Sequence, residues 1–219
     1  MFSRVQFPKN HTHLAWIENK PYESLQSYAA RMAERITHPN PTLIGLSFGG
    51  IVAQEIAAIR PIKKLILIST IKSKDEKPRF MAAAGVTGAT TLIPMSLLKR
   101  ANKLAAYAFS LVNPEEQEVL QSCFENTSPE HLKWAMNHIA NWEGVNISTP
   151  IFHIHSDKDR VFRSNRDSGD VQIHGGHFAV FTNADELNEV LKRSSITQRS
   201  RPPNPKPLFF SIQHLLQQP

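Results

Sequence analysis

The sequence has a single cysteine, Cys123, among its 219 residues. One cysteine excludes an internal disulfide framework and a zinc site built from several cysteines. Apolar residues make up 41% of the chain and charged residues 20%, a balance typical of globular proteins and not of disordered or collagen-like ones. We therefore expect one domain, or one domain with a small insertion, with a substantial core.

The end of the chain lacks acidic side chains. From Val190 onward there is no Asp or Glu, and the basic residues are Lys192, Arg193, Arg199, Arg201 and Lys206. The formal net charge of +6 therefore divides into +5 for this tail and +1 for residues 1–189. A body so close to neutral gives little support to a nucleic-acid surface, and no nucleic-acid partner is expected.

Long hydrophobic runs are also missing. The start of the chain has no apolar run of signal-peptide length. The longest uncharged stretch, between Arg79 and Lys99, is long enough for a membrane helix. It contains Pro94, two glycines and few strong hydrophobes, so we expect no membrane span and a cytoplasmic protein.

Short β-rich runs alternate with helical stretches, which is the pattern of a parallel sheet covered by helices. Helices are expected over residues 22–36 and 48–59, where apolar side chains recur at helical spacing. The expected strands are residues 13–17, 42–46, 65–69, 151–155 and 171–173. The predicted fold class is α/β, with a mostly parallel sheet and flanking helices.

The alternation stops between residues 72 and 146, which predicts a helical cap inserted over the end of the sheet. The expected helices are residues 81–84, 95–111, 114–124 and 129–142, the last two opening with proline at a first-turn position. The predicted core is residues 1–71 and 147–193. Residues 194–219 hold five of the fifteen prolines and no acid, so a flexible tail is expected there.

The strongest motif is Gly45-Leu46-Ser47-Phe48-Gly49, between the expected strand 42–46 and the expected helix 48–59. A tight strand–turn–helix connection pushes a serine Oγ out at the strand end, and the helix N-terminus directs N–H groups at a developing oxyanion. Glycines two before and two after Ser47 avoid a collision between strand and helix. The motif alone also fits a simple glycine-rich turn.

Two further strand ends carry an acid and a base. The strand 151–155 is followed by Asp157 and Asp159, and the strand 171–173 by His174 and His177. A serine nucleophile needs a base, and the base needs an orienting acid. Because the carboxyl ends of parallel strands meet at one rim of a sheet, these residues can be gathered beside Ser47.

With these motifs the sequence resembles the α/β-hydrolase family over about residues 2–193. Ser47 matches the nucleophile elbow, Asp159 the acid in "IHSDKDRVF" and His177 the base in "GGHF". The cap falls where the family carries its lid. The resemblance implies a serine hydrolase for an ester, thioester or similar small acyl substrate, in which the Phe48 N–H holds the oxyanion. It implies no cofactor and no metal; substrate identity, hydrolysis against acyl transfer, and oligomeric state stay open.

Neighbouring residues compete for two of these roles. Asp157 could replace Asp159, although family spacing favours Asp159 and makes Asp157 a solvated turn residue. His174 lies nearer the strand than His177, but the two glycines before His177 let the loop fold the imidazole over the serine.

His153 and His155 are two residues apart and could share one face of a strand beside Asp157 and Asp159, which suggests a metal cluster. The interpretation that we favour from the sequence is a pair of core or rim histidines on a sheet.

Only 41 residues precede Thr42. The family places several strands there, and a Gly-rich loop after one of them donates a second oxyanion N–H. That strand, which would lie between residues 13–17 and 42–46 in the sheet, is not expected here. The natural start may lie upstream of Met1, or the chain may be a non-catalytic or truncated α/β-hydrolase-like protein. Residues 207–212, "PLFFSI", could pair into the gap, but we do not expect this.

Overall fold

The computed structural model describes residues 2–7, 10–88, 109–111, 114–163, 170–196 and 207–210. These residues form a six-stranded sheet of order β1-β6-β2-β3-β4-β5, in which every neighbouring pair is parallel. The strands are β1 Thr12–His13, β2 Thr42–Leu46, β3 Lys64–Ile68, β4 Ile151–Ser156, β5 Val171–Ile173 and β6 Pro207–Phe210. The predicted α/β class is confirmed.

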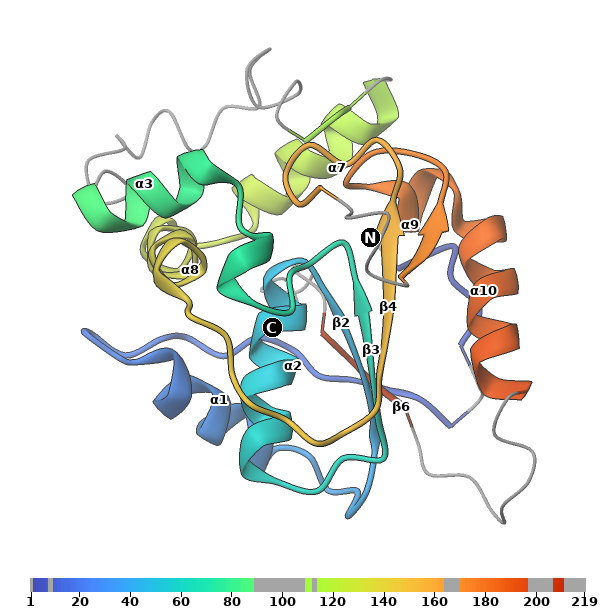
Figure 1. Ribbon diagram of the computed structural model, residues 1–219, viewed down its shortest axis with the longest axis horizontal. Helices are drawn as coiled ribbons and strands as arrows, with labels where there is room; N and C mark the ends of the chain where they lie inside the picture. The colour runs from blue at the N-terminus through green and yellow to red at the C-terminus, as the bar shows by residue number, and fades with distance from the viewer. Residues whose placement is uncertain are drawn as a thin grey trace.

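Helices cover both faces of the sheet (Figure 1). The core helices are α1 Leu25–Glu34, α2 Phe48–Ile59, α9 Ala179–Thr182 and α10 Ala184–Ile196. In Figure 1, α1 and α2 lie on the left of the strands and α10 on the right. This arrangement explains why the strands have few polar positions, since both of their faces are covered.

The core is divided by the sheet because side chains along a strand alternate between its two faces. Leu65 and Leu67 of β3 join the core on the side of α1 and α2. Ile66 and Ile68 join the core on the side of α9 and α10. β3 thus contributes to both cores and holds the two sides of the molecule together.

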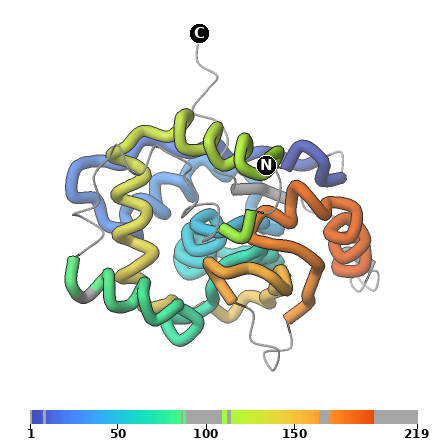
Figure 2. The backbone as a smooth tube through the Cα atoms, turned by 90° about the horizontal axis from the view of Figure 1, so that it is seen from above, coloured from blue at the N-terminus to red at the C-terminus, as the bar shows by residue number. Residues whose placement is uncertain are grey.

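Helices between β3 and β4 lie above the carboxyl ends of the strands (Figures 1 and 2). They are the 3₁₀ turn η1 Lys74–Glu76 and the helices α3 Arg79–Thr87, α7 Pro114–Glu125 and α8 Pro129–Asn141. Pro129 starts α8 because proline tolerates the first helical turn, and the Ser128 side chain caps it by accepting the His131 N–H at 3.1 Å. We call residues 72–146 the cap segment.

The expected helix over residues 95–111 lies mostly outside the described residues, and residues 109–111 are not helical. Cys123 of α7 is buried in the core on the α10 side, and burial raises the pKa of its thiol to about 11. Within the described parts of the chain, no helix has both the length and the apolar character needed to cross a membrane.

Strand β6 corrects two expectations from the sequence. The chain from residue 194 onward was expected to be flexible, yet Ser194 belongs to α10 and Pro207–Phe210 forms β6; the remainder lies outside the described residues. β6 lies between β1 and β2, where the sequence predicts a gap. Its register pairs Leu208 with both Thr12 and Leu43. Unpaired backbone groups along β1 and β2 favour such pairing.

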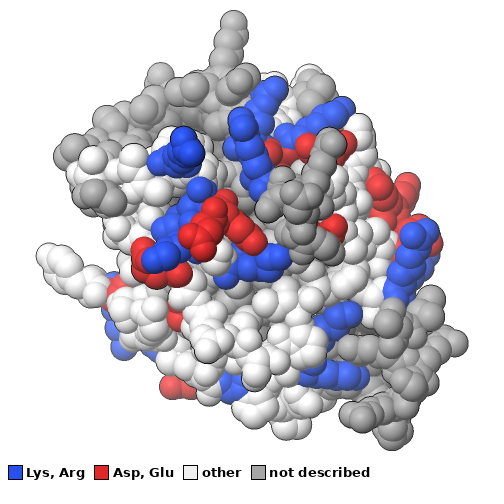
Figure 3. Space-filling model, viewed as in Figure 1, with Lys and Arg blue, Asp and Glu red and all other residues white. Residues whose placement is uncertain are grey.

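The other strand predictions differ mainly at the ends. β2 and β5 have the expected bounds, β3 and β4 shift by one residue at an end, and β1 covers only Thr12–His13 instead of residues 13–17. On the face drawn in Figure 3, most described Lys and Arg side chains lie beside Asp and Glu side chains.

Candidate active site

Ser47 occupies a strained turn between β2 and α2. Its backbone has φ 53° and ψ −124°, a conformation that L-residues rarely adopt and that recurs at functional sites. The Ser47 N–H donates to the Ile68 carbonyl of the neighbouring strand β3 at 3.0 Å, which fixes the turn against the sheet. A Cβ at Gly45 would lie 2.5 Å from the Gly49 carbonyl oxygen, so the motif needs glycine where the strand and helix meet.

A continuous chain of polar contacts joins Ser47, His177 and Asp159. The Ser47 Oγ lies 3.0 Å from Nε2 of His177, and Nδ1 of the same ring lies 2.8 Å from Oδ2 of Asp159. All three residues are buried, with 8%, 4% and 4% exposure. The carboxylate accepts a proton at Nδ1, which leaves the Nε2 lone pair directed at the serine hydroxyl.

The Asp159 side chain is held from its other side by backbone groups. Its Oδ1 accepts the N–H groups of Val161 at 2.8 Å and Phe162 at 3.0 Å. The turn after β4 therefore orients the carboxylate, and both oxygens have partners. This matters because a buried carboxylate without partners is costly.

The loop that carries His177 packs closely against residues 109 and 110 of the cap segment. A Cβ at Gly176 would lie 2.6 Å from the Ser110 carbonyl oxygen, so this contact requires glycine. The His177 N–H donates to the Phe109 carbonyl at 3.3 Å, and the two rings meet edge to face at 5.4 Å. The motif analysis did not identify Phe109, since no spacing in the sequence links it to the histidine.

The competing residues form a separate pair. Nδ1 of His174 lies 3.1 Å from Oδ2 of Asp157, on an imidazole that is 64% exposed. Burial would raise the pKa of Asp157, but the Gly175 N–H and His174 outweigh it and hold this pKa below its usual value. Of the two candidate acid–base pairs, the structure brings His177 and Asp159 to Ser47.

His153 and His155 share one face of β4, as the sequence suggests, with ring centroids 4.0 Å apart. Their acidic neighbour is Asp170, whose Oδ2 lies 3.2 Å from Nδ1 of His153 and 3.8 Å from Nε2 of His155. Asp157 and Asp159, the acids that the sequence analysis considered, pair instead with His174 and His177.

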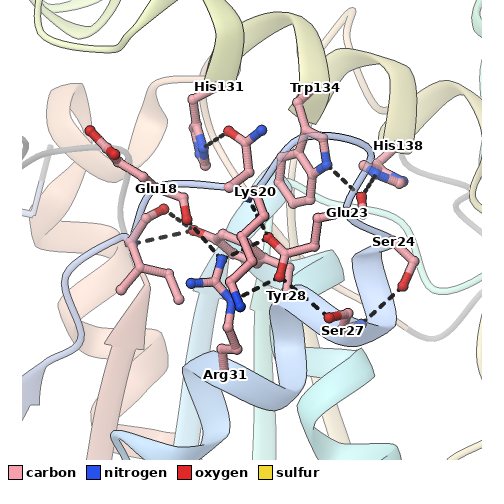
Figure 4. Close-up of polar contacts among 12 residues, drawn as sticks. Glu18, Lys20, Glu23, Ser24, Ser27, Tyr28, Arg31, His131, Trp134 and His138 are labelled. Atoms are coloured by element: carbon pink, nitrogen blue, oxygen red, sulfur yellow. Dashed lines mark hydrogen bonds and ion pairs between the residues drawn. The ribbon is translucent and has the colours of Figure 1, made fainter.

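The cap segment is attached to the core at the start of α1 (Figure 4). The Glu23 carbonyl accepts the Trp134 indole N–H at 2.8 Å and lies 3.1 Å from Nε2 of His138. The Glu23 carboxylate accepts two hydrogen bonds from Arg31, at 2.8 and 2.7 Å. Burial alone would raise the pKa of Glu23, but these bonds outweigh it and the pKa is lowered. The sequence analysis assigned Trp134 to the core and missed this junction.

Phe48 is the first residue of α2 and lies directly after Ser47. A first-turn N–H has no acceptor within its own helix and sits at the positive end of the helix dipole. The Phe48 ring stacks on Trp16 at 5.7 Å and meets Trp134 edge to face at 5.7 Å. An aromatic cluster shared by the core and the cap segment thus adjoins the serine.

No protein-family model matches the chain, and no curated protein matches its sequence. Several solved structures are similar in fold. A thermophilic esterase from Thermogutta terrifontis has a TM-score of 0.60 at 15% identity, over 80% of this chain and 73% of the other. A lipase-esterase related protein from Clostridium acetobutylicum ATCC 824 has a TM-score of 0.56 at 17% identity, over 81% and 77%.

A meta-cleavage product hydrolase is similar at a TM-score of 0.55 and 15% identity, over 83% of this chain and 74% of the other. At such identities the likeness concerns the fold alone. Together with the parallel sheet, the flanking helices and the turn at Ser47, it confirms the resemblance that the motifs predict: the chain has the α/β-hydrolase fold.

Proposed function

We propose that the chain is a serine hydrolase that cleaves an ester, thioester or similar small acyl substrate through an acyl-enzyme. One observation carries the proposal: the serine at the strained turn contacts an imidazole that in turn contacts a buried carboxylate, at 3.0 and 2.8 Å. Nucleophile and base within hydrogen-bond reach, with the base oriented by a third group, is the arrangement that activates a serine.

In this proposal Ser47 Oγ attacks the substrate carbonyl while its proton passes to Nε2 of His177. Asp159 holds the imidazole tautomer and stabilises the imidazolium that forms. Collapse of the tetrahedral intermediate breaks the acyl–oxygen or acyl–sulfur bond, and His177 returns the proton to the leaving group. A water deprotonated by His177 then releases the acyl group and restores the serine. These steps use side chains and water alone.

The oxyanion is assigned to the Phe48 N–H at the start of α2. The sequence offers no Gly-rich loop ahead of Ser47 to supply the second donor that the family resemblance implies. One missing donor lowers turnover by roughly 10²–10³-fold. We therefore expect a slow hydrolase whose acylation by reactive probes is easier to detect than its turnover of ordinary esters.

An apolar acyl group fits the surroundings of the serine best. The rings of Trp16, Phe48 and Trp134 gather beside the turn, and aromatic side chains favour apolar ligands. Because Trp134 belongs to α8, the cap segment would act as the lid over the substrate and exclude water. An alcohol or amine acceptor in place of water would convert the same chemistry into acyl transfer.

The test is labelling of the 219-residue chain with a fluorophosphonate probe, followed by mass spectrometry of the modified peptide. We expect modification at Ser47 and none in Ser47→Ala. His177→Ala should slow labelling by at least about 100-fold, whereas His174→Ala, the matched control on the same loop, should label at the unmodified chain's rate.

Absence of labelling in a chain that circular dichroism shows to be folded would contradict the proposal. That result would favour the second interpretation, a non-catalytic protein of the same fold. Equal loss of labelling in His174→Ala and His177→Ala would contradict the assignment of the base.

A further inference from the structure

A second buried polar cluster lies on β4, apart from the Ser47–His177 contact. The side chains of His153 and His155 are each 2% exposed and point to one face of the strand. Two carboxylates lie beside them, that of Glu76 from η1 and that of Asp170 just before β5. Three ligand atoms, one each from Glu76, His153 and His155, lie within 4.8 Å of one another.

The hydrogen bond of His153 leaves a nitrogen that needs a positive partner. Its Nε2 lies 3.0 Å from the Thr70 carbonyl oxygen, and because a carbonyl can only accept, Nε2 carries the proton. Nδ1 of the neutral ring is then a bare lone pair. It faces Oδ2 of Asp170 at 3.2 Å and makes no hydrogen bond within the described structure.

A lone pair facing a carboxylate oxygen is the arrangement that metal sites use. Histidines that bind metals donate their second N–H to a backbone carbonyl or a carboxylate, which fixes the tautomer and aims the other nitrogen at the ion. Thr70 provides such a carbonyl for His153. Nδ1 of His155 is also buried without a hydrogen-bond partner among the described residues, so a second ring nitrogen in the cluster is available for coordination.

A cation already lies among the carboxylates. The Lys72 ammonium lies 2.8 Å from Oδ1 of Asp170 and 3.7 Å from Oε1 of Glu76. Its side chain is 25% exposed, so it can swing outward. The cluster therefore attracts positive charge, and a lysine supplies it in the absence of an ion.

We propose that His153, His155, Glu76 and Asp170 form a site for one divalent transition-metal ion of the zinc class. Two imidazole nitrogens with carboxylate oxygens are a ligand set that zinc prefers. Ligands about 2.1 Å from a tetrahedral zinc lie roughly 3.4 Å apart, so rotations that move the side chains inward by about 1 Å would close the site.

Such an ion would have a structural role. Its ligands come from β4, from the start of the cap segment and from the chain entering β5, so the ion would tie the base of the cap to the sheet. The proposal does not depend on catalysis by Ser47. Metal binding, not activity, is therefore the measurement that tests it.

The experiment uses the full chain treated with a chelator and then dialysed. Zn²⁺ is titrated in competition with a chromophoric chelator, and Co²⁺ is added separately to record its visible absorption. We expect one Zn²⁺ per chain and a Co²⁺ spectrum of a four-coordinate site. His153→Ala and His155→Ala should each weaken Zn²⁺ binding by at least about 10-fold, while His174→Ala, an exposed imidazole outside the cluster, should not.

A further variant separates metal coordination from a cluster that is merely buried. Lys72→Met removes the competing ammonium and should tighten Zn²⁺ binding at least about 10-fold, with an unchanged circular dichroism spectrum. If His153→Ala fails to fold, Glu76→Gln tests the same site from a partly exposed position. Failure of both the unmodified chain and Lys72→Met to bind stoichiometric Zn²⁺, or binding that survives loss of both histidines, would overturn the proposal.

Discussion

Asp159 differs from its neighbour Asp157 in what surrounds the carboxylate. Its side chain is fully buried and accepts from Val161, Phe162 and the His177 ring. Asp157 is partly exposed and contacts His174 and Gly175. Two residues of sequence therefore separate a carboxylate that orients the proposed base from one that closes a surface turn.

Replacement of each aspartate by asparagine should separate these roles. In Asp159→Asn the amide can keep the backbone hydrogen bonds, but its NH₂ group opposes Nδ1–H and stabilises the wrong imidazole tautomer. We expect fluorophosphonate labelling of Ser47 to slow by about 10²–10⁴-fold, measured as a pseudo-first-order rate at pH 7. Asp157→Asn should stay within about twofold of the unmodified chain. Similar losses in both variants would contradict the assignment.

His131 makes the stability of the cap–core junction depend on pH. Burial lowers the pKa of His131 to about 4 from 6.5. The unfolded chain therefore binds a proton at this residue between pH 6.5 and 4 while the folded chain does not. The free energy of unfolding must fall as the pH falls through this range, by about 2 kcal/mol between pH 7 and 4.5.

Urea unfolding of His131→Gln at pH 7 and pH 4.5 measures this contribution. We expect the variant to lose about 2 kcal/mol less than the unmodified chain on acidification, because glutamine does not titrate. Its amide can still reach Asn19, the partner of the histidine at 3.0 Å. An identical pH dependence in the two chains would contradict the lowered pKa.

At the scale of elements, the ease of prediction depended on how local the signal was. The bounds of β2 and α2 could be read from the sequence because the glycine motif marks both the strand end and the helix start. β6 could not, because four residues carry little periodicity. Its pairing is decided by unpaired edges that come from strands far away in the chain.

The candidate site divides in the same way. Ser47, Asp159 and His177 each follow a strand, and a parallel sheet brings such positions to one rim. The partners of His153 and His155 could not be predicted, because Glu76 and Asp170 come from two irregular segments. Nothing in the spacing shows that these segments meet at β4.

Removal of β6 tests whether it completes the sheet. A chain ending at residue 206 would leave β1 without its partner and expose one edge of β2, since β6 pairs with both. Total stability is typically only about 5–15 kcal/mol, so we expect loss of cooperative thermal unfolding and increased binding of an apolar dye. A chain ending at residue 210, which keeps the strand, is the control. Equal melting curves for the two truncated chains would contradict the pairing.

On the scale of the whole molecule, the two cores are linked by strands that belong to both. All three tryptophans report on one side: Trp16 and Trp142 lie in the core next to α1 and α2, and Trp134 packs against it. Leu187 is fully buried in the opposite core, on α10. If β2 and β3 couple the two sides, damage at Leu187 must change the unfolding that tryptophan fluorescence detects.

We expect Leu187→Ala to destabilise the protein by about 2–5 kcal/mol and to shift the urea midpoints from fluorescence and from far-UV circular dichroism together. Glu189→Ala, on the exposed side of the same helix where Glu189 pairs with Lys192 at 2.8 Å, should stay within about 0.5 kcal/mol. A fluorescence midpoint that stays fixed while the dichroism curve splits would show that each core unfolds separately. The sheet would then join two independent halves instead of one cooperative unit.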